Sequence, residues 1–309
     1  MKIVLLDALT FGNTDLSKFE QFGYVESYLT SSPDEVSKRI TNADVIVTNK
    51  VVIDDLLMQQ TPSLKLICVA ATGMNNIDLA SAKQRGIAVK NVAGYSTDSV
   101  IQHTFSMLFF LMGHSMYYDE YVKSGAYSRS KIFTDVSNPF SEIKGKRWGI
   151  IGLGSIGRGV ANIAKAFGAE VVYYSTSGKN YAEDFEHIEI SELLKICDII
   201  SIHAPLNEQT NNLLDYEQLF TCKDSAIVLN LGRGGIINEE AVARLVEEKN
   251  IYFGLDVLSK EPMQENHPLL SVKNKDKLYI TPHIAWASVE AREKLIAGVI
   301  ENIKETFSL

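Results

Sequence analysis

The chain has 309 residues, of which 46% are hydrophobic and 22% charged, with a formal net charge of -8. This length predicts two domains of ordinary globular composition, and the acidic balance argues against a nucleic-acid partner or an anionic membrane surface. Three cysteines lie far apart in apolar runs, which predicts buried thiols in a reducing compartment and no metal site. No apolar run is long enough to span a membrane and the amino terminus lacks a signal peptide, so we expect a cytoplasmic protein.

The first hundred residues alternate short apolar runs with polar helical patterns, which predicts a parallel sheet. Strands are expected at 3–6, 44–48, 64–70 and 86–91, and helices around 34–42, 53–60 and 77–84. Asn49 and the pair Thr72-Gly73 follow two of these strands, where open parallel sheets bind ligands. The backbone at Thr72 and Gly73 could bind a carboxylate; alternatively, Gly73 only permits a turn and Asn75-Asn76 caps the next helix.

A long apolar pattern then predicts one helix from Ser99 to Tyr118, in which His103 is expected to be a packing or interface residue. Residues 124–143 lack clear periodicity and carry aromatic and polar side chains. We expect a long excursion there, either an arm onto a partner subunit or a loop packed on its own chain.

From Lys146 the alternation resumes, and it predicts a second, doubly wound sheet. Its strands are expected at 148–151, 169–174, 198–203, 225–230, 252–257 and 278–281, with helices at 160–167, 191–196, 215–220, 239–248 and 288–309. Gly152, Gly154 and Gly157 form G-x-G-x-x-G between the first strand and its helix. The first glycine permits a tight turn, the second leaves room for a pyrophosphate and the third lets the helix pack closely. Ser155 and Ile156 would offer backbone N–H groups to the phosphates, so we predict a dinucleotide site.

Ionisable side chains follow the later strands of this sheet, namely Arg233, Asp256, Glu261 and His283. Arg233 lies between glycines and suits a substrate carboxylate, which it can bind bidentately. An arginine, a carboxylate and an imidazole at one sheet edge could transfer a proton to or from an anionic substrate. Each residue also has a plain structural interpretation: a salt bridge for Arg233, a cap for Asp256 and a solvated acid for Glu261.

Together these motifs resemble the D-isomer-specific 2-hydroxyacid dehydrogenase family over essentially the full length of the chain. The resemblance rests on Ala71-Thr72-Gly73 with Ile77-Asp78, the glycine motif, His203-x-Pro205-Leu206, Asn230-x-x-Arg233-Gly234, Leu255-Asp256-Val257 with Glu261-Pro262, and Thr281-Pro282-His283. Three further pieces are similar to its glycerate dehydrogenase (hydroxypyruvate reductase) branch: Thr48-Asn49-Lys50, Gly94-Tyr95-Ser96-Thr97 and His283-Ile284-Ala285-Trp286.

The resemblance implies an oxidoreductase that reversibly reduces a small 2-keto acid, with hydroxypyruvate or glyoxylate favoured, to a D-2-hydroxy acid by hydride transfer from NAD(P)H. His283 would be the general acid, and Glu261 would bond its other ring nitrogen, fix its tautomer and favour the imidazolium. Arg233 would bind the substrate carboxylate and polarise the carbonyl. The remaining contacts implied are Thr72 and Gly73 to the carboxylate, Asn49 and Trp286 to the substrate pocket, Asp256 to the nicotinamide carboxamide, and His203 and Pro205 to the cofactor.

The same resemblance implies a discontinuous domain organisation. A flavodoxin-like substrate domain would comprise residues 1–98 and 284–309, and a Rossmann cofactor domain, residues 99–283, would be inserted in it. The resemblance also implies a homodimer formed through the cofactor domain. A nucleotide-sensing, corepressor-like binding protein on the same fold is the alternative function, which the acidic charge disfavours.

One position departs from the pattern of an NAD-specific fold. Such folds carry an acid after the second strand that binds the ribose hydroxyls. Here Ser175, Thr176 and Ser177 occupy that strand end, followed by Lys179. These hydroxyls and this cation favour NADP over NAD. Alternatively, the segment is a plain polar loop that contacts the ribose through its backbone.

Overall fold

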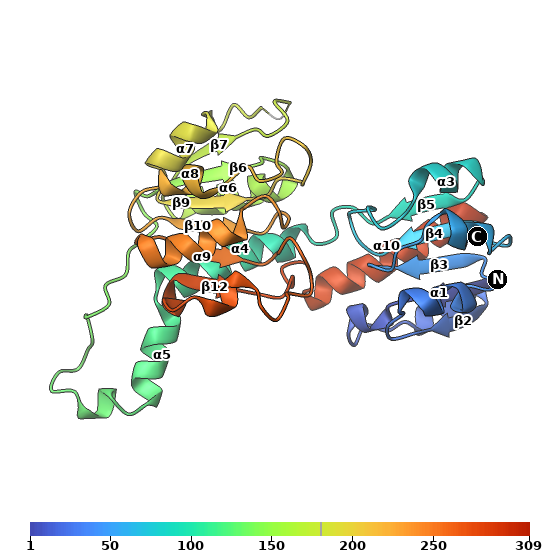
Figure 1. Cartoon of the computed structure of the whole chain (residues 1–309), viewed down its shortest axis with the longest axis horizontal. Helices are drawn as coiled ribbons and strands as arrows, with labels where there is room; N and C mark the ends of the chain where they lie inside the picture. The colour runs from blue at the N-terminus through green and yellow to red at the C-terminus, as the bar shows by residue number, and fades with distance from the viewer. Residues whose placement is uncertain (180) are drawn as a thin grey trace. The chain divides into compact units, whose positions relative to one another are not determined.

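The computed structural model describes residues 1–179 and 181–309, and these form two units (Figure 1). The smaller unit combines Met1–Ser96 with Ala287–Leu309, and the larger unit is Thr97–Trp286. Each unit contains one sheet in which every neighbouring pair of strands is parallel. The predicted fold class, two doubly wound α/β domains with parallel sheets, is confirmed.

The sheet of the smaller unit has the order β2-β1-β3-β4-β5. Its strands are β1 (Lys2–Leu5), β2 (Tyr24–Ser27), β3 (Val45–Thr48), β4 (Leu66–Val69) and β5 (Ala88–Asn91), and its helices are α1 (Pro33–Arg39), α2 (Asp55–Gln59), α3 (Leu79–Gln84) and α10 (Val289–Phe307), with 3-10 turns at Ala8–Phe11 and Ser17–Phe22. Every residue of β3 and β4 is buried, which explains their unbroken apolar sequences. α10, from the far end of the chain, packs on β4 and β5.

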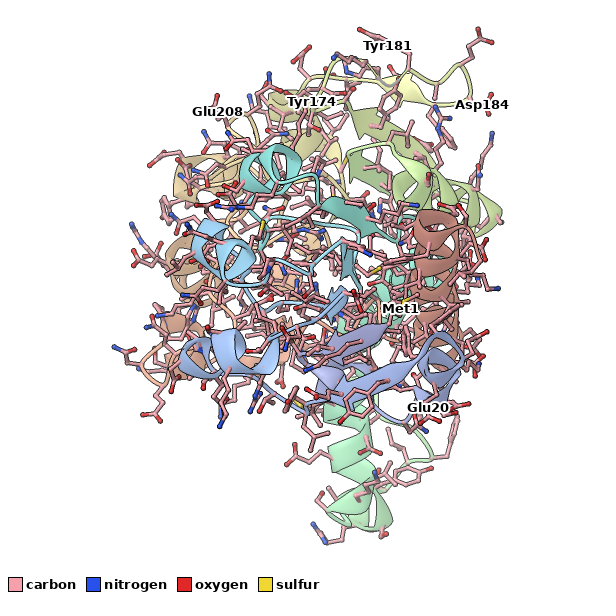
Figure 2. The ribbon with its side chains drawn as sticks, turned by 90° about the vertical axis from the view of Figure 1, so that its right-hand side faces the viewer. Met1, Glu20, Tyr174, Tyr181, Asp184 and Glu208 are labelled. Atoms are coloured by element: carbon pink, nitrogen blue, oxygen red, sulfur yellow. The ribbon has the colours of Figure 1, made fainter. Side chains whose placement is uncertain are left out.

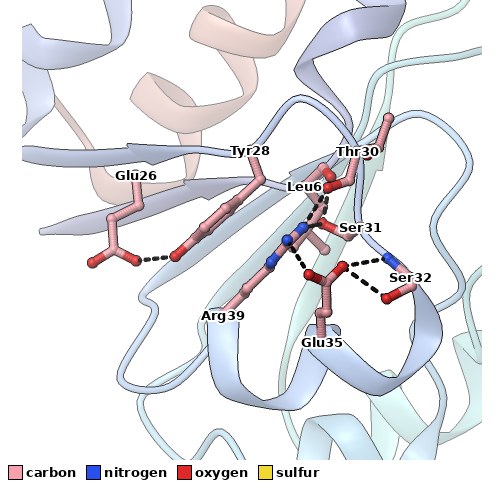
Figure 3. Close-up of polar contacts among 8 residues, drawn as sticks. All are labelled: Leu6, Glu26, Tyr28, Thr30, Ser31, Ser32, Glu35 and Arg39. Atoms are coloured by element: carbon pink, nitrogen blue, oxygen red, sulfur yellow. Dashed lines mark hydrogen bonds and ion pairs between the residues drawn. The ribbon is translucent and has the colours of Figure 1, made fainter.

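A polar cluster fixes the segment between β2 and α1 (Figure 3). The Glu35 carboxylate accepts hydrogen bonds from the backbone N–H and the hydroxyl of Ser32, at 2.9 and 2.7 Å, and so caps the start of α1. Arg39 forms an ion pair with Glu35 at 2.6 Å and also donates to the Thr30 carbonyl and the Ser31 hydroxyl. Its guanidinium lies over the Tyr28 ring, 4.3 Å from the centroid. One arginine therefore joins the end of the helix to the segment that precedes it.

The sheet of the larger unit has the order β12-β11-β10-β9-β6-β7-β8. Its strands are β6 (Arg147–Ile151), β7 (Glu170–Tyr174), β8 (Glu186–His187), β9 (Ile199–Ile202), β10 (Ile227–Asn230), β11 (Tyr252–Leu255) and β12 (Leu278–Ile280), and its helices are α4 (Thr97–Met112), α5 (Ser115–Lys123), α6 (Ser155–Ala166), α7 (Ile190–Ile196), α8 (Tyr216–Phe220) and α9 (Glu239–Glu248). Residues of α4 and α6 form the core on one face of the sheet, and residues of α7, α8 and α9 form the core on the other. The strand order reverses between β6 and β9, which is where such sheets bind ligands at their carboxyl edge.

The prediction of a single helix from Ser99 to Tyr118 is wrong. α4 ends at Met112 and a new helix begins at Ser115, because His114 adopts a left-handed conformation with φ of 46°. The apolar face of α4 is buried, whereas α5 has no buried residue. The apolar side chains of α5 therefore do not contribute to the hydrophobic core of this chain. Two short strands, β2 and β8, were also not predicted; β8 is exposed and neither contains an apolar run.

The three cysteines, Cys68, Cys197 and Cys222, are free and buried as predicted, and burial raises the pKa of each thiol to about 12. Across the described residues, none of the helices has the length and apolar character needed to cross a bilayer. The same residues contain no cluster of His, Cys, Asp and Glu side chains suited to a metal ion.

Candidate functional site

The glycine motif forms a tight turn between β6 and α6. Gly152 has φ of +92°, and a Cβ there would lie 2.8–2.9 Å from the backbone of Ala204, so only glycine suits the position. Gly154 is the N-cap of α6, and a Cβ there would meet no atom within 4 Å. Space is therefore open directly before a helix N-terminus whose first N–H groups, from Ser155 onward, need an acceptor.

Two buried polar atoms flank this turn. Within the described residues, Ser175 Oγ and His203 Nδ1 are the buried side-chain polar atoms that lack a hydrogen-bond partner. Ser175 directly follows β7 and His203 directly follows β9, and these strands are the two neighbours of β6. Because buried polar groups are normally paired, their position on both sides of the glycine turn indicates a polar ligand at this edge.

The His203 ring is held in place by its neighbours. Trp148 Nε1 donates to Ser201 Oγ at 2.9 Å, and Ser201 Oγ lies 3.0 Å from His203 Nε2. Ser201 Oγ thus accepts a hydrogen bond from the indole and forms a second hydrogen bond with the imidazole, which fixes the plane of the His203 ring. Burial lowers the pKa of His203 to about 3, so the ring is neutral at physiological pH. Nδ1 is thus a buried polar atom beside the glycine turn that lacks a partner among the described residues.

The loop after β7 is anchored at its far end. In the sequence, Tyr174 precedes this loop and Tyr181 follows it, and both are labelled in Figure 2. Arg158 of α6 donates to the Tyr181 carbonyl at 3.0 Å, and the Tyr173 hydroxyl accepts from Ala182 N at 3.0 Å. Tyr173, two residues before Ser175 in the sequence, packs with α6. The predicted cofactor residues Ser175, Thr176 and Ser177 therefore lie on a loop tied to the first turns of α6.

Arg233 lies on a turn that Asn230 organises. The buried Asn230 side chain donates to the Arg233 carbonyl at 2.9 Å and accepts from Gly232 N at 3.1 Å. The Arg233 side chain is exposed and donates to the Gly232 carbonyl at 2.8 Å. The structure shows no salt bridge for Arg233 among the described residues, contrary to its plain structural interpretation. Its guanidinium keeps donors for an anion.

His283 and Glu261 form a direct pair. His283 Nδ1 lies 2.7 Å from Glu261 Oε2, with the side chains 24% and 33% exposed. Since a carboxylate only accepts, Nδ1 carries a proton and Nε2 is the nitrogen left to exchange one with a ligand. His283 has φ of +53°, a conformation uncommon outside glycine, and its N–H is held by the Asp256 and Thr281 carbonyls at 2.8 and 2.9 Å.

Asp256 supports the turn that carries His283. Its carboxylate is 1% exposed and accepts from the Thr281 hydroxyl at 2.6 Å, from Ile284 N at 2.9 Å and from Ala285 N at 3.0 Å. His103 of α4 packs beside it and hydrogen-bonds Thr281 at 3.1 Å, in keeping with the predicted packing role. Burial lowers the pKa of His103, although the nearby Asp256 acts in the opposite direction.

The other predicted contact residues are divided between the two units. Pro205 is exposed, with its carbonyl bonded to the Thr210 hydroxyl at 2.7 Å, and Trp286 packs against the α4–α6 core. Asn49, Thr72 and Gly73 belong to the smaller unit, and the structure does not bring them together with Arg233, Glu261 and His283 within one unit.

Two features of the smaller unit bear on its predicted residues. The buried Asp7 carboxylate accepts from the backbone N–H of Asn49 at 2.9 Å and of Lys50 at 2.7 Å, so it fixes the loop after β3. The suggested capping of α3 by Asn75-Asn76 is wrong: Asp78 is the N-cap. Asn76 instead donates to the Val51 carbonyl at 2.9 Å, because one helix start needs only one cap.

Comparison with known proteins assigns the family. The model of the D-isomer specific 2-hydroxyacid dehydrogenase NAD binding domain matches residues 105–285. The chain belongs to this family. It is 35% identical to a putative 2-hydroxyacid dehydrogenase of Haemophilus influenzae over 99% of the chain and 98% of that protein. It is 36% identical to a hydroxypyruvate reductase of Blautia hydrogenotrophica over 99% and 96%.

Among solved structures, an acyclic imino acid reductase, Bsp5, in complex with NADPH and D-Arg is similar at a TM-score of 0.85. It shares 30% identity and covers 100% of this chain and 97% of its own. As a D-2-hydroxyacid dehydrogenase, the enzyme uses a nicotinamide cofactor to reduce a 2-keto acid to a 2-hydroxy acid. No comparison supports the corepressor-like alternative.

Proposed function

We propose that this dehydrogenase reduces hydroxypyruvate or glyoxylate, with His283 as the general acid. The observation that carries this proposal is the 2.7 Å pair of His283 Nδ1 with Glu261, in the same unit as the exposed Arg233. The choice of substrate is supported by relatives named hydroxypyruvate reductase, glycerate dehydrogenase and glyoxylate reductase.

Each site residue has a separate role in the proposed reaction. Arg233 binds the substrate carboxylate and polarises the neighbouring carbonyl. The dihydronicotinamide, when bound, supplies the hydride to the carbonyl carbon. His283 gives its Nε2 proton to the carbonyl oxygen, and Glu261 stabilises the imidazolium that precedes this transfer. Asp256 Oδ2 accepts from Ala285 N at 3.0 Å and, as a carboxylate oxygen with a further lone pair, can also accept from the carboxamide, which supports that proposed contact.

The two units take different parts in this proposal. The smaller unit would be the substrate-binding domain, where the backbone of Thr72 and Gly73 holds the carboxylate and Asn49 lies in the pocket. The larger unit would hold the cofactor through Gly152, Gly154, Ser155, Ile156 and Gly157, with His203 and Pro205 beside the turn and Trp286 toward the substrate. The experiment is a kcat/KM panel over hydroxypyruvate, glyoxylate, pyruvate and larger keto acids. A preference for pyruvate or a larger acid would contradict the proposed substrates.

We also propose that NADP is favoured over NAD. The unpartnered Ser175 Oγ and the nearby cation of Lys179 support a 2′-phosphate, and no acid is present at 175–179 to repel it. Arg158 adds a second cation, since its guanidinium is bound to the far end of the same loop. Ser175→Asp should lower the ratio of kcat/KM for NADPH to that for NADH by about tenfold or more, which corresponds to about 1.4 kcal/mol. Ser175→Asn is the uncharged control, and an equal ratio in both variants would contradict the proposal.

We further propose a cytoplasmic homodimer formed through the cofactor domain. The support is α5, which has no buried residue, and the following segment, in which Phe133 is 89% exposed and Phe140 is exposed as well. Three free thiols support a reducing compartment. Sedimentation equilibrium should give a dimer, and replacing Phe133 and Phe140 by serine should raise the monomer fraction; a wild-type monomer would contradict this proposal.

A further inference from the structure

The turn that carries Arg233 touches the loop that carries Glu261. Gly234 packs directly on the peptide between Leu258 and Ser259, so closely that a Cβ would overlap the Leu258 carbonyl and Ser259 N. Only glycine allows this backbone-to-backbone approach. Arg233 and Glu261 are therefore each within two residues of the same contact.

Glu239 binds the same peptide as Gly234. Its carboxylate accepts from Ser259 N at 2.6 Å, from Ser259 Oγ at 3.0 Å and from His267 Nε2 at 2.8 Å. The Glu239 and His267 side chains are only 10% and 11% exposed. These three hydrogen bonds to a nearly buried carboxylate hold Ser259 firmly against Glu239, because charge-assisted bonds are short and strong.

His267 can serve only as a donor to Glu239. Leu269 N donates to His267 Nδ1 at 3.3 Å, which leaves a proton on Nε2 to donate to the carboxylate. An amide nitrogen in place of the carboxylate oxygen would face this proton without an acceptor. The attachment therefore depends on the charge and not merely on the size of Glu239.

The fixed peptide continues into the proton-transfer pair. Leu258 N donates to Glu261 Oε1 at 3.0 Å, so the Glu261 carboxylate closes its own loop on the residue that Gly234 contacts. Its other oxygen binds His283 Nδ1 at 2.7 Å. A continuous set of contacts thus runs from Glu239 through Ser259 and Glu261 to His283.

We propose that Glu239 is a positioning residue for the reduction. Through Ser259 it holds Glu261, and hence His283, at a fixed distance from Arg233, so that the carboxylate and carbonyl of one substrate meet both groups at once. This inference rests on the proposed roles of Arg233, Glu261 and His283. Such sites need geometry held to within about 0.5 Å, and a misplacement of about 1 Å can cost on the order of 100-fold in rate.

Glu239→Ala tests the proposal. We expect kcat with hydroxypyruvate to fall about 10–100-fold, while the Kd for NADPH, measured by fluorescence, changes less than about twofold because this carboxylate is remote from the glycine turn in sequence and contacts. The KM for hydroxypyruvate should change less than kcat, because the Arg233 groups that bind the substrate carboxylate are kept. Glu239→Gln should fall between wild type and Glu239→Ala, because it keeps a carbonyl for Ser259 N but loses the His267 bond.

Glu240→Gln is the matched control, because Glu240 is the exposed neighbour in the same first turn of α9. It removes the same charge from the helix N-terminus. If kcat and KM of Glu239→Ala equal those of Glu240→Gln, the proposal is overturned. Should Glu239→Ala fail to fold, Glu239→Gln decides, because it keeps the size of the side chain and loses the His267 bond; wild-type kcat in that variant overturns the proposal. An active His283→Ala would instead refute the proposed function itself.

Discussion

The three glycines of the motif should respond differently to alanine, and the pair Gly154 and Gly157 tests the assignment of the turn. At Gly154 the backbone has an ordinary φ of -79° and a Cβ meets no protein atom within 4 Å. The loss of a favourable N-cap and the gain in chain stiffness each amount to about 1 kcal/mol or less and oppose one another. Gly154→Ala should therefore change the Tm by less than about 4 °C.

Cofactor affinity should change far more in the same variant. The added methyl group occupies the space before the N-terminus of α6, so a pyrophosphate could not approach the N–H groups of Ser155 and Ile156. A hydrogen bond to a charged group contributes about 1.5–3 kcal/mol, and loss of two gives about 3–6 kcal/mol. The Kd for NADH and NADPH should rise on the order of 100-fold to 10,000-fold in fluorescence titrations.

Gly157→Ala, unlike Gly154→Ala, should lower the Tm of the protein in the absence of cofactor. Its Cβ would overlap the Gly152 carbonyl and lie 3.1 Å from Ile150 Cγ2, which pushes α6 away from β6. Overpacking of this kind costs about 1–3 kcal/mol, so the Tm should fall by several degrees. Calorimetry in the absence of cofactor compares the Tm of the two variants. Unchanged cofactor affinity in Gly154→Ala, or an unchanged Tm in Gly157→Ala, would refute this division of roles.

Further measurements address the other site residues. His283→Ala should lower kcat about 100-fold to 10,000-fold, the usual contribution of general acid catalysis, and full activity would remove it from that role. Arg233→Ala should chiefly raise the KM for the keto acid, and Arg233→Lys should restore little because it lacks the bidentate fork; an unchanged KM would count against carboxylate binding. Burial holds the pKa of His203 at about 3 against an ordinary 6.5. The contribution of the neutral ring to the free energy of unfolding is therefore complete above pH 6.5 and is lost as the pH falls from 6.5 toward 3. His203→Asn should flatten that part of a urea-unfolding series, and an unchanged slope would argue against a neutral buried ring.

The sequence predicts the strands wherever an apolar run is buried on both faces, as in β3, β4, β9 and β10. It misses β2 and β8 because edge strands need no such run. The helix break at His114 interrupts a long apolar pattern, and its signal is local: Gly113 and Ser115, which flank His114, both have lower helix propensity than the apolar residues around them. Tertiary packing determines where the first helix ends, because α4 packs its apolar face into the core and α5 has no buried residue.

The sequence likewise predicted some residues of the candidate site and missed others. The rule that ligands bind at strand carboxyl ends located Arg233, Asp256 and His283, but no spacing rule pairs Glu261 with a histidine 22 positions away. That pairing came from the family resemblance. Glu239 gave no functional signal, because an acid in the first turn of a helix is already explained by the helix dipole. Its contacts with Ser259 and His267 depend on a loop whose path the sequence does not specify.

The discontinuity of the smaller unit has a consequence for the nascent chain. β1 to β5 leave the ribosome before the whole of Thr97–Trp286, and α10 emerges only afterwards. Until then β4 and β5 lack the buried side chains of α10, Leu295 and Val299 among them, and the Asn302 bond to the Asn91 carbonyl is missing. The dinucleotide-binding unit is contiguous and can fold while synthesis continues. β1 to β5 are therefore made before the dinucleotide-binding unit and complete their packing after it, and a chaperone that binds exposed apolar sheet would act on them in that interval.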